Sequence, residues 1–155
     1  MSAAAVRPAF WMILRLCVLA VVLAAVWVID RREKRIPDRV LLPGAAAALL
    51  RFLEGVTAAD FLRGLMPAVL LLVLSVLLEK LLHRRVLGGG DIKLTGMLGL
   101  HLGLEKTLLT LFLAAVFGLV EALPRKKSER EFAFGPMLAA AAAVVLLFGE
   151  KLLAG

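Results

Sequence analysis

Cysteine and histidine are scarce in this sequence. Its 155 residues include one cysteine, Cys17, and two histidines, His83 and His101. A single cysteine excludes both a disulfide within the chain and a cysteine-rich metal site, and the two histidines lie far from each other and from any ligand spacing. We therefore expect no metal and no other cofactor. We interpret His83 as a residue of the membrane interface and His101 as an ordinary helix residue.

Aromatic residues are also few, at 6%, and they do not alternate with basic residues. The net charge is nevertheless +7, which in another context would suggest nucleic-acid binding. No soluble domain is apparent that could present such a surface. We expect no nucleic-acid partner and interpret the lysines and arginines as signals of membrane topology.

Long apolar blocks dominate the chain. Hydrophobic residues make up 62% of it and the mean hydropathy is +0.96, whereas soluble domains are closer to half apolar. Short charged clusters separate the blocks, which is typical of a polytopic membrane protein. We predict an all-α integral membrane protein with six transmembrane helices. The six predicted spans are 10–29, 40–53, 61–82, 92–104, 107–123 and 137–153.

A cleaved signal peptide is the alternative for the first block. That block contains Arg15, and it runs through 26–29 into a charged cluster rather than into a small-residue cleavage site, so we expect it to be retained. With both termini outside, thirteen of the 19 lysines and arginines fall in or beside the loops after the first, third and fifth spans. The positive-inside rule therefore favours this topology.

The predicted topology brings two aspartates to one side of the membrane. Asp30 ends the first span and Asp91 begins the fourth, so both lie at the cytoplasmic boundary. Two carboxylates that meet in a low-dielectric site cannot both ionise easily, and one keeps its proton. The ionised one can then activate water while the protonated one polarises a peptide carbonyl. The alternative is that both aspartates only cap helices or pair with nearby arginines.

Three short motifs at the edges of the predicted spans strengthen the catalytic interpretation. The stretch 88–94, Gly-Gly-Gly-Asp-Ile-Lys-Leu, resembles the GxGD signature of the type IV prepilin peptidases, which are membrane aspartic proteases. An aspartate followed by basic residues and Ile-Pro-Asp resembles the first motif of that family, and Phe-Gly-Pro before the last span resembles its third. The residues that carry the resemblance are Asp30, Ile36, Pro37, Asp38, Gly88, Gly89, Gly90, Asp91, Lys93, Phe134, Gly135 and Pro136.

The resemblance implies an aspartic endopeptidase that removes the short basic leader of type IV prepilin-like or pseudopilin-like precursors at the cytoplasmic face of the inner membrane. Cleavage by such enzymes usually follows a glycine at the head of the substrate's hydrophobic helix. Asp30 and Asp91 correspond to the catalytic pair. Membrane lipids are the other expected partner, and the oligomeric state is left open.

The other motif residues have supporting roles in this interpretation. The three glycines at 88–90 would let the backbone turn tightly, with positive φ at no steric cost. Lys93 would position the loop or contact a carboxylate, although a lysine snorkelling to the membrane interface is the commoner case. Asp38 would be structural, and Gly135 with Pro136 would start a helix near the site.

Larger members of the family carry a further cytoplasmic segment with paired cysteines and methylate the new N-terminus of the pilin. No such insert lies between the predicted helices. We therefore expect residues 1–155 to form a single membrane-embedded peptidase domain without a methyltransferase or zinc-binding segment. It would be similar to the short forms associated with Flp/Tad-type pili, with an archaeal preflagellin peptidase as the related alternative.

Two other classes of function are weighed against this one. A small transporter or channel with intramembrane carboxylates predicts repeats between the two halves, and the stretch 88–91 has no counterpart in the first half. A non-catalytic assembly subunit would use small-residue faces such as 96–99 for packing, but it leaves the two aspartates without a role.

Acidic residues near the site would face the basic leader of a precursor. We predict that the following side chains supply this negative charge, with pairing to neighbouring arginines as the alternative: Glu33, Asp38, Glu129 and Glu131.

Overall fold

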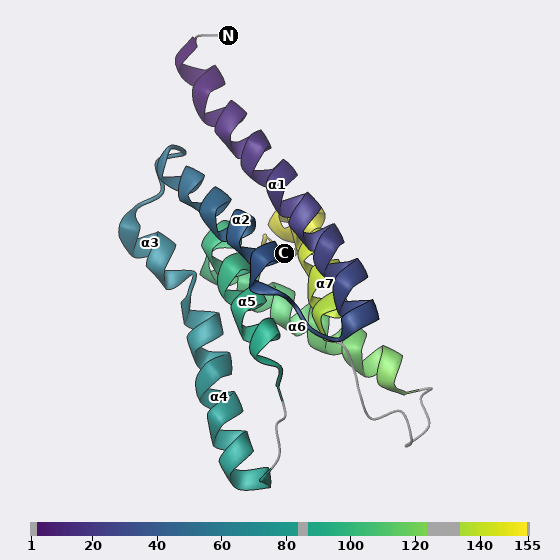
Figure 1. Cartoon of the computed structure of the whole chain (residues 1–155). Helices are drawn as coiled ribbons and strands as arrows, with labels where there is room; N and C mark the ends of the chain where they lie inside the picture. Colours follow the sequence, from purple (N-terminus) through teal and green to yellow (C-terminus); the bar gives the residue numbers. More distant parts are fainter. Residues whose placement is uncertain (1–2, 84–86, 124–133, 155) are drawn as a thin grey trace.

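The part of the chain that the structure, a computed structural model, describes consists of helices joined by turns and short loops (Figure 1). That part comprises residues 3–83, 87–123 and 134–154, with side chains from residue 9 onwards. It contains no strand, so the prediction of an all-α fold is confirmed. The helices are α1 (Ala3–Glu33), α2 (Asp38–Ala48), the 3-10 helix η1 (Leu49–Phe52), α3 (Ala58–Arg63), α4 (Met66–Leu82), α5 (Gly89–Leu102), α6 (Leu104–Ala122) and α7 (Gly135–Leu153).

Three helical stretches of the described residues are long and apolar enough to cross a membrane: Ala9–Glu33, Ala58–Leu82 and Gly135–Leu153. The helices α2 and α5 have 11 and 14 residues, or about 17 and 21 Å of length, against about 30 Å of hydrocarbon. The 19-residue α6 carries charged residues near both ends. The chain therefore has the character of an integral membrane protein, and six crossings stay a prediction.

The third predicted span is interrupted. A turn at Gly64 and Leu65 separates α3 from α4, and Pro67 lies in the first turn of α4. The interruption has a steric basis. A Cβ atom on Gly64 would clash with the carbonyl group of Gly99 in α5, and one on Gly99 would clash with that of Gly64. Two glycine backbones are therefore in direct contact where this turn meets α5.

The boundary between the fourth and fifth predicted spans also differs from the prediction. We placed the break at Glu105 and Lys106, but α5 and α6 are separated by Gly103 alone. Gly103 has φ of 83°, in the left-handed region that glycine adopts without a steric penalty. Hydropathy placed the break at the charged residues, whereas backbone geometry places it at the glycine.

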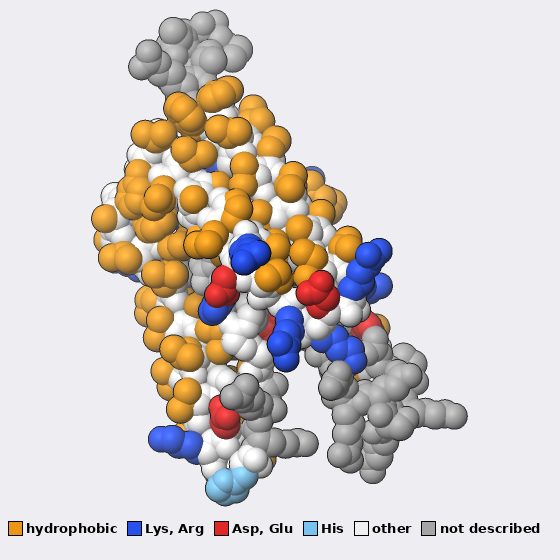
Figure 2. All heavy atoms as spheres, in the orientation of Figure 1, with side chains coloured by type: hydrophobic (Ala, Val, Ile, Leu, Met, Phe, Trp, Pro, Cys, Tyr) orange, Lys and Arg blue, Asp and Glu red, His pale blue; other side chains and the backbone are white. Residues whose placement is uncertain are grey.

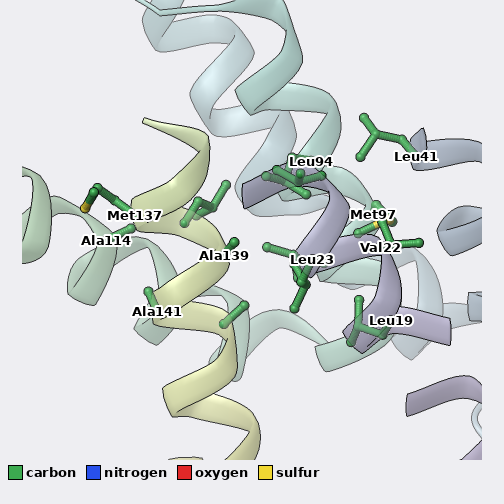
Figure 3. Close-up of a cluster of buried hydrophobic side chains, with 14 residues drawn as sticks. Leu19, Val22, Leu23, Leu41, Leu94, Met97, Ala114, Met137, Ala139 and Ala141 are labelled. Carbon is green, nitrogen blue, oxygen red and sulfur yellow. The ribbon is translucent and has the colours of Figure 1, made fainter. Parts of the chain in front are cut away.

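A cluster of buried aliphatic side chains joins α1, α5 and α7 (Figure 3). Leu23 of α1, Leu94 of α5 and Ala139 of α7 are among its members. The alanines of α7 allow close approach of neighbouring helices, as small residues do in membrane proteins. This packing sets α7 beside both α1 and α5, and the end of α1 and the beginning of α5 line one cavity (Figure 1).

Hydrophobic side chains cover the upper part of the face drawn in Figure 2, and charged side chains gather in its lower part. Large apolar side chains also lie exposed along α4, including Val69, Leu70, Val73, Leu77 and Leu81. An apolar surface of this extent requires an apolar environment. It fits a helix in contact with lipid.

Arg15, the charged residue within the first apolar block, is buried and paired. Its guanidinium donates to the Glu54 carboxylate at 2.7 and 3.0 Å and to the His101 carbonyl oxygen at 2.8 Å. The Nε2 atom of His101 lies 2.8 Å from the Gly44 carbonyl oxygen. The cluster ties α1 to α2 and α5 about 22 Å along α1 from Asp30. His101 is thus a buried helix residue, and His83 lies exposed at the end of α4.

Candidate active site

Asp30 lies in the last turn of α1 with its carboxylate buried in the protein. The residue is 5% exposed, and its Oδ2 atom has no hydrogen-bond partner among the described residues. The backbone of Gly135, the first residue of α7, lies directly against this carboxylate, so that a Cβ atom on Gly135 would clash with Oδ2. A buried carboxylate oxygen without a partner is costly in a purely structural role.

Lys34 directly follows α1, and its backbone conformation turns the chain back across the site. Its φ of 52° is left-handed, which is uncommon for a residue other than glycine, and its amide donates to the Asp30 carbonyl oxygen at 2.9 Å. The turn brings Ile36 against α5 and α7. A Cβ atom on either Gly90 or Gly135 would lie 3.1 Å from a side-chain atom of Ile36. These two glycines therefore make room for the isoleucine that follows the first aspartate.

The three glycines at 88–90 do not form the positive-φ turn that we expected. Gly88 has φ of −74° and ψ of 137° and is the N-cap of α5, while Gly89 and Gly90 are its first two residues. Their steric surroundings differ. A Cβ atom on Gly88 would lie 3.2 Å from the Asp91 Oδ2 atom, whereas one on Gly89 would meet nothing within 4 Å. Close approach at Gly88 and Gly90, rather than an unusual φ, explains the need for glycine.

Asp91 is the third residue of α5 and is half-buried. Gly88 is the N-cap residue, so Asp91 does not occupy that position, but the Asp91 carboxylate accepts a hydrogen bond from the Gly88 amide and so caps the start of α5 from its third residue. Asp91 precedes the apolar run 92–104 and lies outside the three stretches able to cross a membrane. Burial raises the pKa of its carboxyl to about 6, and the charge of Asp30 contributes to the shift, while a backbone hydrogen bond from Gly88 opposes it. The two carboxylates are therefore electrostatically coupled.

One cavity of about 580 Å³ contains both aspartates. Its lining consists of Asp30, Lys34, Arg35, Ile36, the glycines 88–90 and Asp91. Lys34 and Arg35 were not expected to line the site, because the basic stretch after Asp30 was interpreted as a topology signal and as a spacer within the first motif. The available indication that Lys34 and Arg35 line the cavity was their position in the sequence, four and five residues after Asp30.

Asp38 and Lys93 connect the first two motifs outside this cavity. The Lys93 Nζ atom donates to both oxygens of Asp38, at 2.7 and 3.0 Å. Both side chains are more than half exposed. Lys93 therefore contacts a carboxylate, but that of Asp38 rather than one of the aspartates in the cavity. Pro37 is the N-cap residue of α2.

The third motif starts α7 at the site. Phe134 is the N-cap residue, and the helix begins with Gly135 and Pro136, two residues before the predicted span. Proline fits there because the first amides of a helix have no partner within it. Pro136 is fully buried, so the start of α7 is fixed beside Asp30.

The acidic residues expected to face a basic leader are only partly described. Glu33 is exposed at the end of α1, and Asp38 is paired with Lys93. Glu129 and Glu131 lie outside the described residues. That these four acidic residues face the basic leader stays a prediction.

Within residues 3–83, 87–123 and 134–154, no cluster of three or more His, Cys, Asp or Glu side chains could hold a metal ion.

Comparison with known sequences identifies the family. The type IV leader peptidase family matches residues 17–123, a range that contains both aspartates of the cavity. The chain belongs to this family. No solved structure matches the chain significantly.

Several relatives are prepilin leader peptidase/N-methyltransferases. The protein of Aeromonas salmonicida (strain A449) is 33% identical over 150 residues, covering 92% of this chain and 52% of its own length. That of Aeromonas hydrophila is 31% identical with the same coverage. That of Burkholderia pseudomallei (strain 1026b) is 36% identical over 139 residues, covering 84% of this chain and 45% of its own length. The chain thus spans about half the length of the curated relatives it matches.

Proposed function

We propose that this chain is a membrane aspartic endopeptidase that removes the short basic leader from type IV prepilin-like precursors. The observation that carries the proposal is the cavity that contains both Asp30 and Asp91. One of these carboxylates has an unpartnered buried oxygen, and the other has a raised pKa. Perturbed carboxylates that share a cavity are a feature of catalytic sites. Membership of the leader peptidase family supports the same function.

The two carboxylates divide the chemistry of peptide hydrolysis. One proton is shared by the pair, because two buried charges of the same sign repel each other. The ionised carboxylate takes a proton from a water molecule, and the resulting hydroxide attacks the scissile carbonyl carbon. The protonated carboxylate donates a hydrogen bond to the carbonyl oxygen and stabilises the charge that develops there. Collapse of the tetrahedral intermediate breaks the C–N bond, and the leaving amine takes a proton from the pair.

The surrounding residues fit this chemistry. Ile36 packs between Gly90 of α5 and Gly135 of α7. It therefore fixes the end of α1, which carries Asp30, relative to the beginning of α5, which carries Asp91. A peptide bond can approach beside the glycines 88–90, which line the cavity and carry no side chains of their own. Two cations, Lys34 and Arg35, line the same cavity.

The proposed substrate is a precursor with a basic leader followed by a hydrophobic helix. The proposed location is the inner membrane, with multiple spans, the site at the cytoplasmic face and the termini outside. The positive-inside distribution of basic residues supports this orientation. We further propose that residues 1–155 act as one peptidase unit, since the aspartates and the buried core belong to one helical assembly.

The alternative of a non-catalytic assembly subunit finds less support. The small residues at 96–99 are already in contact within the chain. A Cβ atom on Gly96 would lie 3.5 Å from the Cβ of Ala68, and one on Gly99 would clash with Gly64. The face that would bind another subunit therefore packs against the chain's own α3–α4 segment.

Processing of a prepilin tests the proposal. The chain is co-expressed with a prepilin, and leader removal is followed as a mobility shift on a gel. Asp30→Asn and Asp91→Asn are each expected to lower the rate by at least about 10³-fold, since each removes one member of a pair that acts as a unit. Full processing by either variant would reject the two-aspartate mechanism.

Asp60→Asn is the matched control. Asp60 is an exposed aspartate that pairs with Arg63 in α3, and it does not line the cavity. This variant is expected to process the precursor at the wild-type rate. A comparable loss in Asp60→Asn would show that the effect of the other two variants is not specific to the cavity.

A further inference from the structure

An apolar groove lies beside the candidate active site, on the outside of the bundle. It has a volume of about 450 Å³. Leu41, Leu42 and Ala45 of α2 form one wall, and Leu65, just before α4, contributes the other. The floor is α5, which packs against both α2 and α4 (Figure 1).

The groove begins two residues along α5 from Asp91, on another side of that helix. Its charged lining residues are Asp38 and Lys93, which pair with each other. Two residues are about 3 Å along a helix but about 200° around it, so a peptide passes from the active-site cavity into the groove over the first turn of α5. From Lys93 the groove continues to Leu100, about 10 Å or two helical turns along α5.

We propose that this groove binds the first turns of the substrate's hydrophobic helix, an inference that rests on the proposed function. Cleavage at the junction of the leader and the helix requires the helix to begin within a few residues of the scissile bond. The groove begins two residues along α5 from Asp91, so a short extended segment over the first turn of α5 joins the two, and the groove accommodates side chains from about two turns of a helix. An amphipathic or apolar helix docks in such a groove through residues spaced three and four apart.

The charges at the mouth favour a peptide over a lipid. Lys93 is the cation that lines the groove, and both oxygens of Asp38 hold its ammonium group. A lipid phosphate at the mouth would have to displace Asp38 or lie beside its negative charge. The basic leader of a precursor meets no such repulsion from Asp38.

A variant whose groove is filled by a larger side chain tests whether recognition of the substrate's helix can be lost while catalysis is retained. Ala45→Phe places a large side chain in the groove, and Ala46→Phe, its matched control, makes the same change at an exposed residue of α2 that does not line the groove. Each variant is assayed on a full precursor and on a short soluble peptide that contains the leader and the cleavage junction without the helix.

We expect Ala45→Phe to raise the KM for the full precursor by about tenfold or more, with kcat for the precursor and kcat/KM for the short peptide within about twofold of wild type. Retained cleavage of the short peptide shows that the variant is folded. We expect Ala46→Phe to match wild type on both substrates. An unchanged KM for the full precursor in Ala45→Phe would overturn the proposal, and so would an equal loss on both substrates.

Crosslinking tests the groove without relying on cleavage. Cys17 is the chain's one cysteine, so Cys17→Ser gives a background without thiols. In this background, with Asp91→Asn to prevent cleavage, Leu42→Cys is oxidised together with precursors that carry single cysteines in the first two turns of the helix. Leu147→Cys in α7 is the control, since Leu147 is also highly exposed and does not line the groove.

A disulfide from position 42 and none from position 147 would support the groove. A crosslink from position 147 alone, or equal crosslinking from both, would overturn it. Because this measurement needs no cleavage, it also separates the two proposals. Crosslinking at position 42 by a chain whose wild type does not process the precursor would reject the proposed peptidase activity and retain the binding groove.

Discussion

Asp38 and Lys93 form a bidentate ion pair that joins the segment after the first aspartate to the helix that carries the second. The Lys93 Nζ atom lies 2.7 and 3.0 Å from the two carboxylate oxygens of Asp38. Asp38 begins α2, and Lys93 lies in the first turns of α5. The pair therefore fixes the position of Asp91 relative to the chain that leaves Asp30, although neither of its members lines the active-site cavity.

Breaking this pair is expected to impair activity more than stability. Asp38→Asn or Lys93→Met should lower the free energy of unfolding by about 1 kcal/mol or less, because both side chains are largely exposed. The processing rate should fall by about tenfold, since a small displacement of a catalytic group is costly. The exchange Asp38→Lys with Lys93→Asp should recover part of the rate in the same gel assay. Equal losses in the single and exchanged variants would refute a positioning role for the pair.

Gly89 and Gly90, which precede Asp91, are expected to differ sharply in how their substitution by alanine affects the protein. Gly90→Ala places a methyl group 3.1 Å from Ile36 and should destabilise the protein by about 1–3 kcal/mol, with a loss of processing, because the Ile36 contact orders the site. Gly89→Ala meets nothing within 4 Å and should leave stability equal or up to about 1 kcal/mol higher. Thermal unfolding in detergent and the processing assay measure both effects. Equal behaviour of the two variants would contradict the steric account.

The sequence predicted which segments are helical, because hydropathy and charge act locally along the chain, and it predicted that Asp30 and Asp91 lie near each other. It did not predict how the glycines act. Gly88, Gly89 and Gly90 suggested an unusual backbone turn, but the constraint at Gly90 comes from Ile36, more than fifty residues away. A constraint imposed by a distant side chain leaves no periodicity in the local sequence.

The interruptions of the apolar blocks were also misplaced, for a related reason. Gly64 breaks the third block where its backbone meets Gly99, and Gly103 breaks the chain one residue before α6. Charged residues mark the ends of spans in a hydropathy profile, whereas these breaks are set by backbone contact and left-handed φ. The burial of Arg15 against Glu54 was likewise not predicted. A charge inside an apolar block was the available signal that a partner had to exist.

The raised pKa of Asp91 predicts a pH dependence of stability. The pKa rises from 3.8 to about 6, mainly through burial and then through the charge of Asp30, so the folded chain keeps a proton that the unfolded chain releases between about pH 4 and 6. The stabilisation from that proton is complete below the unfolded pKa and is lost as the pH rises through 6. Unfolding in detergent should therefore occur at a higher temperature at pH 5 than at pH 7.5.

Asp91→Asn should reduce this difference, since the amide cannot ionise. Asp60→Asn, a change at an exposed aspartate, should preserve it and is the control. A difference between the two pH values that is the same in wild type and Asp91→Asn would show that Asp91 is not its source.

The buried pair of Arg15 and Glu54 is expected to contribute more to stability than its exposed counterpart. Arg15→Leu leaves a largely buried carboxylate without its cation and should cost about 3–5 kcal/mol, whereas Arg63→Leu, which breaks the exposed pair with Asp60, should cost about 1 kcal/mol or less. The double variant Arg15→Leu with Glu54→Leu should recover much of the loss, because no unpaired charge then remains buried. Unfolding in detergent measures each value, and a double variant no more stable than Arg15→Leu alone would show that the cost comes from lost packing rather than from the unpaired charge.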